Sequence, residues 1–406
     1  MAIRQVGIAD NPGAGGFYPH SHNFDYDGGF LFPDVRIFGA VIDGVTDDTT
    51  AILDALAALP SVYMPEGTYR TTANILVGPG KELVGPMQGA AIIRPSVAVG
   101  TALTVNSGNV KNILLDGTDT NAAIGLLIGS VLSATTKIID VEVMNFLGAG
   151  AIGIKLRQAV ETSFLRVYSH GNTKNLTLDP EAGDGTPTSL WTMDSLFREA
   201  VEEGVLILGS VLTDWWNCVF ESNHKEGMKI LPGAGVTAFH NILRTCWFEN
   251  NWLGDGARTT KYSLTVDGNA AGASAGVHLE HVYFLGSAAT EKSIDLNMVR
   301  WTSLSKVTTP SGVAGAIRVQ NALSEVTFID DAGRTAQTNL ANPDGAYIYY
   351  PFQGILTPGG LLDISKPYTI MTLPVYADNA AAILGGLVAG QFYRSNGDPD
   401  AVCIVH

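Results

Sequence analysis

Two glutamates occupy matching places in two similar segments of this sequence. Glu221 lies in CVFES (218–222) and Glu249 in CWFEN (246–250). If these segments are neighbouring strands of a parallel stack, the two carboxylates stand one strand spacing apart, ~4.8 Å. That is close to the ~5–5.5 Å between the two carboxyl groups of a retaining glycosidase, where a raised and a lowered pKa divide the acid and nucleophile roles. The pattern therefore predicts Glu221 and Glu249 as a catalytic pair.

Aromatic and acidic side chains accompany the two glutamates. Flat aromatic faces with a polar edge suit the stacking of sugar rings. The residues expected to contact a glycan are four aromatic residues and two flanking acids: Trp215, Trp247, Trp252, Tyr283, Asp214 and Asp255. Glu226 and Asp267 are further acidic candidates.

A structural explanation competes with catalysis. Arg198 takes the place of the glutamate in the preceding segment, SLFRE (195–199). Arg198, Glu221 and Glu249 would then form a surface charge ladder, and exposed ion pairs contribute little to stability. The sequence leaves both interpretations open.

A repeat of 20–50 residues must position these groups, and such a period indicates a solenoid. Phenylalanine recurs at one place in the aligned segments, and a shared register implies shared burial. The predicted inward column is Phe146, Phe197, Phe220, Phe248, Phe284 and Phe328, and the glycines that open the following strands are Gly125, Gly153, Gly204, Gly227 and Gly276. Asn223 and Asn251, three residues after their phenylalanines, are expected to stack and to bond turn amides. Cys218 and Cys246 are expected to face the core.

The most specific sequence pattern lies near the N-terminal end of the predicted solenoid. DVRIFGAVIDGVTDDTTAI (34–52) followed by VYMPEGTYR (62–70) resembles the opening of the pectate-lyase-like right-handed β-helix family. Asp47 or Asp48 can accept hydrogen bonds from the free N–H groups of a short amphipathic helix that ends near Pro60. The resemblance implies an all-β, single-stranded, right-handed parallel β-helix with a short N-terminal capping helix. It implies no particular activity.

The last segment resembles a short module that ends many phage structural proteins. It reads LPVYADNAAAILGGLVAGQFYR (373–394) and DPDAVCIVH (398–406). Together the two resemblances imply a phage tailspike or virion fibre, a family of homotrimers. The expected division is an arm for virion attachment through a tail or capsid adaptor (1–33), the β-helix (34–340), and a small β-rich C-terminal module that sets trimer register (341–406).

Composition limits the partners. The net charge is −15, with 24 Lys and Arg against 39 Asp and Glu, which disfavours nucleic acid and anionic membranes as partners. The chain has 46% apolar residues, 46 glycines and 16% charged residues, typical of a turn-rich β protein. Three cysteines without a C-x-x-C spacing predict neither a disulfide framework nor a zinc site, and no metal or cofactor is expected.

Location follows from the ends and the hydropathy. The first residues show neither the basic start nor the apolar stretch of a secretory signal, and no segment approaches the ~20 apolar residues of a membrane span. We expect assembly in the host cytoplasm and a place on the tail or capsid surface of a virion.

Three functions fit these observations. The first is a trimeric spike or fibre that recognises a bacterial surface polysaccharide during adsorption. The second is a polysaccharide depolymerase, either a glycoside hydrolase or a lyase, on the same scaffold. The third is a non-enzymatic decoration fibre of the capsid or tail.

Overall fold

The structure is a computed structural model that describes one long range of the chain, with gaps, and several short segments after it. Residues 33–329 are described apart from 97–98, 121, 181–188, 254–260, 269–273, 287–291, 311–312, 314–315 and 322–323. Beyond them, the described segments are 340–341, 347–350, 354–357, 360–362, 375–376, 392–395 and 402–404.

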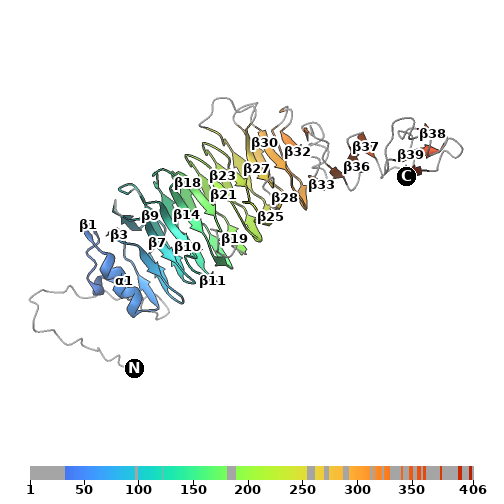
Figure 1. Ribbon diagram of the computed structural model, residues 1–406. Helices are drawn as coiled ribbons and strands as arrows, with labels where there is room; N and C mark the ends of the chain where they lie inside the picture. Colours follow the sequence, from blue (N-terminus) through green and yellow to red (C-terminus); the bar gives the residue numbers. More distant parts are fainter. Residues whose placement is uncertain are drawn as a thin grey trace, which may run out of the picture.

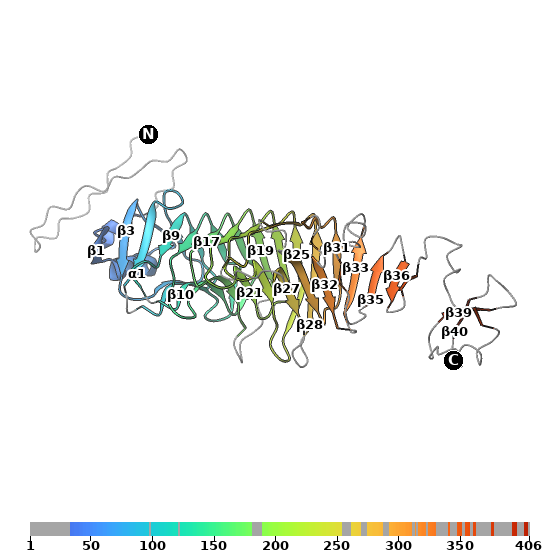
Figure 2. The same ribbon diagram turned by 90° about the horizontal axis from the view of Figure 1, so that it is seen from above.

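Three parallel sheets form the described solenoid, whose strands stack along one long axis (Figures 1 and 2). Sheet A contains β2 (Ser61–Tyr63), β5 (Glu82–Val84), β8 (Asn109–Lys111), β12 (Lys137–Ile139), β16 (Thr162–Leu165), β19 (Ser189–Met193), β22 (Leu212–Trp216), β25 (Thr237–Arg244), β28 (Ser274–Glu280), β31 (Thr302–Ser305) and β33 (Glu325–Ile329). Sheet B contains β1 (Asp43–Asp47), β3 (Gly67–Thr71), β6 (Ala91–Pro95), β9 (Ile113–Asp116), β13 (Glu142–Met144), β17 (Tyr168–His170), β20 (Leu196–Arg198), β23 (Val219–Glu221), β26 (Trp247–Glu249) and β29 (Tyr283–Leu285). Sheet C contains β4 (Ile75–Val77), β7 (Thr101–Val105), β10 (Ile124–Ile128), β14 (Ile152–Leu156), β18 (Lys174–Leu178), β21 (Val205–Ile207), β24 (Met228–Ile230), β27 (Tyr262–Asp267), β30 (Lys292–Asn297), β32 (Ile317–Gln320) and β34 (Leu340–Ala341). The predicted parallel β-helix is confirmed, and β11 (Ser133–Ala134) with β15 (Ala159–Val160) adds a short pair at its side.

A short helix lies at the N-terminal end, as predicted. The 3₁₀ turn η1 (Val35–Phe38) precedes α1 (Thr49–Ala58), which buries Ile52 and Leu56. Asp47 caps the helix, because its Oδ1 accepts a 3.0 Å hydrogen bond from the amide of Thr49. The carboxylate of Asp48 instead turns back to accept from the amide of Val41 at 2.7 Å. The apolar face of α1 covers the first coil, whose sheet edges would otherwise be open.

A column of phenylalanines fills the core behind sheet B. Phe197, Phe220, Phe248 and Phe284 are direct partners in successive strands. Their ring centroids are 5.7, 4.6 and 4.8 Å apart, and each side chain is almost fully buried. Cys218 and Cys246 also face the core, as predicted.

Phe146 and Phe328 are buried as predicted, but neither lies in the phenylalanine column, and Gly276 lies outside the glycine column. Phe146 is buried in the turn after β13, where its amide donates to the Oδ1 of Asn172, so it stands at the asparagine position. Phe328 pairs with Leu304 in sheet A, and Gly276 lies within β28 of the same sheet. The coils differ in length, so a constant spacing along the chain does not keep a residue in one sheet.

Two kinds of corner join the sheets. Between sheets A and B a single residue with positive φ makes the turn, as in Asn217 (51°) and Thr245 (53°). Between sheets B and C the stacked asparagines satisfy turn amides. Asn223 Oδ1 accepts from the amide of Ala200 at 3.0 Å, and Asn223 Nδ2 donates to Asn251 Oδ1 at 2.9 Å. The predicted structural role of this asparagine pair is confirmed.

Strand pairing changes character after sheet A reaches β33. β35 (Tyr347–Tyr350) still pairs parallel with β33, whereas β36 (Gly354–Thr357) and β37 (Gly360–Leu362) continue the sheet antiparallel. The backbone of β38 (Val375–Tyr376), β39 (Phe392–Ser395) and β40 (Val402–Ile404) forms a separate small sheet. The division at 340 stays a prediction, and the expected arm lies outside the described residues apart from Pro33.

Candidate functional site

The two glutamates proposed from the sequence face outward from neighbouring strands. Glu221 of β23 and Glu249 of β26 are direct register partners in sheet B. Both residues are half-buried, and the side chain of Glu221 is 28% exposed. Adjacent parallel strands are about 4.8 Å apart, so the carboxylates can reach the spacing of a retaining carboxyl pair. Their catalytic role remains a prediction.

Trp247 and Tyr283 line the same face beside Glu249. They are register partners with ring centroids 5.9 Å apart. The indole N–H of Trp247 donates a 2.9 Å hydrogen bond to Glu249 Oε2, which fixes the ring and the carboxylate together. Tyr283 is 38% exposed. An aromatic pair and a carboxylate thus form one open surface.

The network extends further along sheet B than the sequence suggested. Arg198 Nη1 lies 3.7 Å from Glu221 Oε1, and its guanidinium lies 5.0 Å from the ring centroid of Tyr168. Tyr168 stacks on His170 at 4.3 Å, and His170 Nε2 lies 2.9 Å from Glu142 Oε1. Sequence reasoning missed Tyr168, His170 and Glu142. Tyr168 and His170 flank Ser169 as Leu196 and Arg198 flank Phe197, and this spacing could have revealed them. We name the surface of Glu142, Tyr168, His170, Arg198, Glu221, Trp247, Glu249 and Tyr283 the sheet B face.

The expectation for Trp215 is corrected. Its side chain is fully buried, packs edge-on against Phe197 and Phe220, and donates from Nε1 to Thr213 Oγ1 at 2.8 Å. A ring in the core cannot stack on a sugar. Its neighbour Trp216 points outward instead and is 44% exposed.

Asp214 and Trp252 do not join the sheet B face. Asp214 faces outward from sheet A, where its Oδ2 lies 2.5 Å from Arg244 Nη1. Trp252 lies in the turn toward sheet C, where its Nε1 donates to the carbonyl of Tyr262 and Lys261 covers its ring at 4.6 Å. Asp255 lies outside the described residues.

Glu226 is a buried acid at the corner between sheets B and C. Its side chain is 6% exposed, and Oε2 has no hydrogen-bond partner among the described residues. Burial raises the pKa of Glu226, and the nearby carboxylate of Glu203 adds to the rise while Lys229 opposes it. The residue is therefore poorly stabilised in its charged form.

Acidification is expected to stabilise the fold through Glu226. A carboxyl whose pKa is raised on folding contributes stability that is fully present below its unfolded value and is lost as the pH rises through the folded value. The melting temperature of Glu226→Gln relative to the wild type should therefore be higher at pH 8 than at pH 5. The exposed Glu325→Gln is the control, and the same difference in both variants would refute the assignment.

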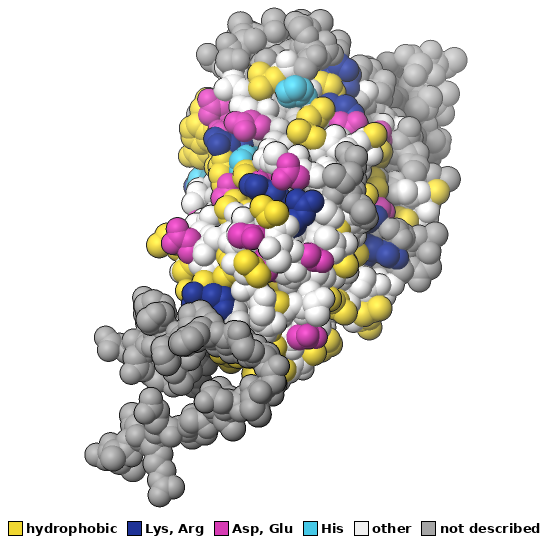
Figure 3. Space-filling model, turned by 90° about the vertical axis from the view of Figure 1, so that its left-hand side faces the viewer, with side chains coloured by type: hydrophobic (Ala, Val, Ile, Leu, Met, Phe, Trp, Pro, Cys, Tyr) yellow, Lys and Arg dark blue, Asp and Glu magenta, His cyan; other side chains and the backbone are white. Residues whose placement is uncertain are grey.

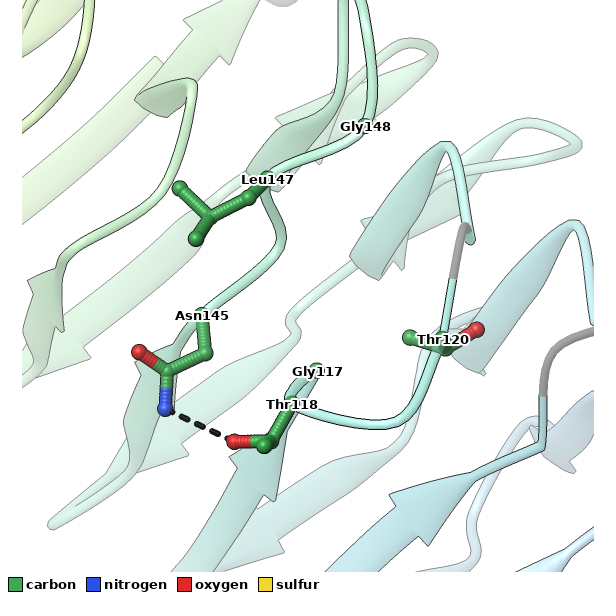
Figure 4. A pocket seen from close by; sticks show the side chains of 6 residues that line it. All are labelled: Gly117, Thr118, Thr120, Asn145, Leu147 and Gly148. Atoms are coloured by element: carbon green, nitrogen blue, oxygen red, sulfur yellow. Dashed lines mark hydrogen bonds between the residues drawn. The ribbon is translucent and has the colours of Figure 1, made fainter.

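A shallow hollow opens elsewhere on the solenoid, with a volume of about 450 Å³. Its lining is Gly117, Thr118, Thr120, Asn145, Leu147 and Gly148 (Figure 4). The carboxylate of the adjoining Asp116 already accepts hydrogen bonds from the side chains of Thr118, Asn145 and Arg94. The hollow therefore offers no free acid or base, and Glu221 lies three strands further along sheet B.

Charges of both signs are interspersed with apolar side chains on the face shown in Figure 3. Among the described residues, no group of three or more His, Cys, Asp and Glu side chains is placed to hold a metal ion. Within the same part of the chain, no helix has the length and apolar character needed to span a membrane.

Comparison with known proteins gives the family. No curated protein matches the chain. Similar solved structures include ORF18 of Geobacillus virus E2 (15% identity, 79% of this chain and 61% of that chain, TM-score 0.49), the N-terminal fragment of bacteriophage Phi29 gene product 12 (15%, 73% and 61%, 0.49) and the Dettilon tailspike protein gp208 (13%, 78% and 67%, 0.42). The chain thus spans 61% of the length of the Geobacillus virus protein. The model of the rhamnogalacturonase A/epimerase, pectate lyase-like family matches residues 32–258, which is more than half of the chain, and the protein therefore belongs to this family.

Proposed function

We propose that this protein is a virion spike or fibre that recognises a host surface polysaccharide through the sheet B face. The observation that carries the proposal is the fixed arrangement of Trp247, Tyr283 and Glu249 on one open surface. Aromatic rings held in place bind a sugar face at small entropic cost, and carboxylates beside them accept hydrogen bonds from hydroxyl groups. The family model agrees with a glycan as ligand.

The proposed place on a virion rests on the order of three segments along the chain. The order of an expected arm, a β-helix and an expected terminal module resembles that of tailspikes, which supports attachment through residues 1–33 and a homotrimer registered by residues 341–406. Light scattering on the purified full chain should give three times the monomer mass of 42.9 kDa. A monomer at working concentration would contradict the trimeric spike.

Binding through the sheet B face is tested with Trp247→Ala. We expect about a tenfold weaker affinity for envelope polysaccharide from the susceptible host, because one stacking surface and the partner of Glu249 are lost. Trp252→Ala is the matched control, since that indole lies in the turn toward sheet C. Equal affinity in the wild type and Trp247→Ala would refute the sheet B face as the binding surface.

A depolymerase on the same surface is the second function, favoured by the register pairing of Glu221 and Glu249. Incubation with the polysaccharide, scored for new reducing ends and for unsaturated sugars, separates a hydrolase, a lyase and a pure binder. Glu221→Gln and Glu249→Gln should each abolish chain cleavage if the pair is catalytic. Cleavage that persists in both variants would exclude the pair.

A decoration fibre without glycan binding is the third function. It predicts normal incorporation into particles and no affinity for the polysaccharide. Imaging of the spike on the particle, combined with the binding assay, distinguishes it from the other two.

A further inference from the structure

The outward face of sheet A carries a second aromatic surface that the proposed site does not use. Trp191, Met193 and Trp216 are 41%, 47% and 44% exposed. Met193 and Trp216 are register partners on β19 and β22, and Trp191 lies on the same face of β19 as Met193. These three side chains therefore form one continuous apolar surface, here called the sheet A patch.

A charge network holds one edge of the patch in place. The guanidinium of Arg244 lies 4.9 Å from the ring centroid of Trp216. It also reaches Asp214 Oδ2 at 2.5 Å and Glu280 Oε2 at 3.3 Å, which are one strand to either side. Three partners fix the guanidinium, and the guanidinium in turn orients the indole of Trp216. The aromatic surface is thus preorganised, which lowers the entropic cost of binding.

The charges select the class of ligand. Asp214 and Glu280 give two negative charges against one positive charge from Arg244, and the whole chain carries −15. Arg244 is already engaged by both acids, so an anionic sugar stacked on Trp216 would meet two carboxylates that a single cation offsets. The side chain of Glu280 is 53% exposed and can accept hydrogen bonds from hydroxyl groups. An uncharged sugar ring with one apolar face fits this surface.

We infer that the sheet A patch is a second carbohydrate-contact site, specific for uncharged sugar rings, on a different sheet from the proposed site. The inference shares with the proposed function the glycan as ligand class but none of its residues. Two faces would let a single subunit engage one polysaccharide at two places, which raises the effective local concentration of the chain.

The test uses the full chain on an immobilised array of neutral hexose and N-acetylhexosamine oligosaccharides and of uronate-containing ones. We expect the wild type to bind neutral members, and the double variant Trp191→Ala with Trp216→Ala to lose about tenfold or more in affinity for them. The double variant to Phe keeps flat rings and should retain most of the binding. Trp301→Ala is the control, because that indole is 58% exposed and packs on Phe239.

Each other outcome overturns the inference. Unchanged binding by the double alanine variant, preference for uronates, or no neutral oligosaccharide bound by the wild type would each refute it. A change of molecular mass in light scattering would make the patch an interface between copies of the chain. Loss of binding in Trp247→Ala alone would support the proposed sheet B site and refute the sheet A patch. Loss of binding in the double alanine variant alone would support the sheet A patch and refute the sheet B site.

Discussion

Replacement of Phe248 by alanine is expected to lower the free energy of unfolding by about 3–5 kcal/mol. Its ring is fully buried between Phe220 and Phe284, with centroids 4.6 and 4.8 Å away. Strands on both sides hold the backbone, so the structure cannot collapse into the space that the ring leaves. The variant therefore loses the transfer free energy of the ring and gains a cavity.

Urea unfolding followed by circular dichroism measures this loss. Leu285→Ala is a suitable control, because Leu285 is the register partner of Glu249 on the outside of sheet B and is 40% exposed. It should cost less than 1 kcal/mol. Phe248→Leu should fall between the two. A loss below 1 kcal/mol in Phe248→Ala would mean that the phenylalanine column does not form as described.

The sequence correctly predicts the four central members of this column, Phe197, Phe220, Phe248 and Phe284. It wrongly adds one phenylalanine at each end. Register in a parallel stack depends on which residues are neighbours in successive coils. Phe197, Phe220 and Phe248 lie in successive coils and are direct partners in sheet B. Two coils before Phe197 the register position is Val143, three residues before Phe146. At the other end Phe328 pairs with Leu304 in sheet A. Phe146 and Phe328 therefore fall into another corner and another sheet, although their spacing along the chain resembles that of the true members.

The error at Trp215 has a specific physical cause. Successive residues of a strand face opposite sides, so Phe220 and Cys218 both point inward. The same alternation, continued backward, would also place Trp216 inward. Asn217 has a φ of 51° and makes the corner between the sheets, which shifts the alternation by one residue. Trp215 therefore enters the core and Trp216 faces solvent.

The candidate site was predictable where it stays within one sheet. Glu221, Glu249, Trp247 and Tyr283 share sheet B, and their relation follows from two aligned strands. Asp214 was expected beside them because it is near in sequence, yet the corner at Asn217 turns it onto sheet A. Proximity in sequence across such a corner does not mean a shared face.

Loss of the asparagine stack is expected to destabilise the fold about as much as a core cavity. Asn223 is fully buried, its Oδ1 accepts from the amide of Ala200 at 3.0 Å, and its Nδ2 donates to Asn251 Oδ1 at 2.9 Å and toward the carbonyl of Phe197 at 3.3 Å. Alanine at this position leaves these groups without that partner in a site that water does not reach. Each orphaned polar group costs about 1–3 kcal/mol, so we expect Asn223→Ala to cost about 2–4 kcal/mol in total.

The readout must separate lost hydrogen bonds from a general loss of packing. Hydrogen exchange of the Ala200 amide should accelerate strongly in Asn223→Ala, because its acceptor is removed, while the amides of α1 at the far end should change little. Asn74→Ala is the control, since that asparagine is exposed and accepts one bond from Thr104 Oγ1. Stability within 0.5 kcal/mol of the wild type, with the Ala200 amide still protected, would show that backbone pairing alone holds this corner. The sheet B face depends on this corner, because it fixes the path of the chain that leaves Glu221 and Glu249.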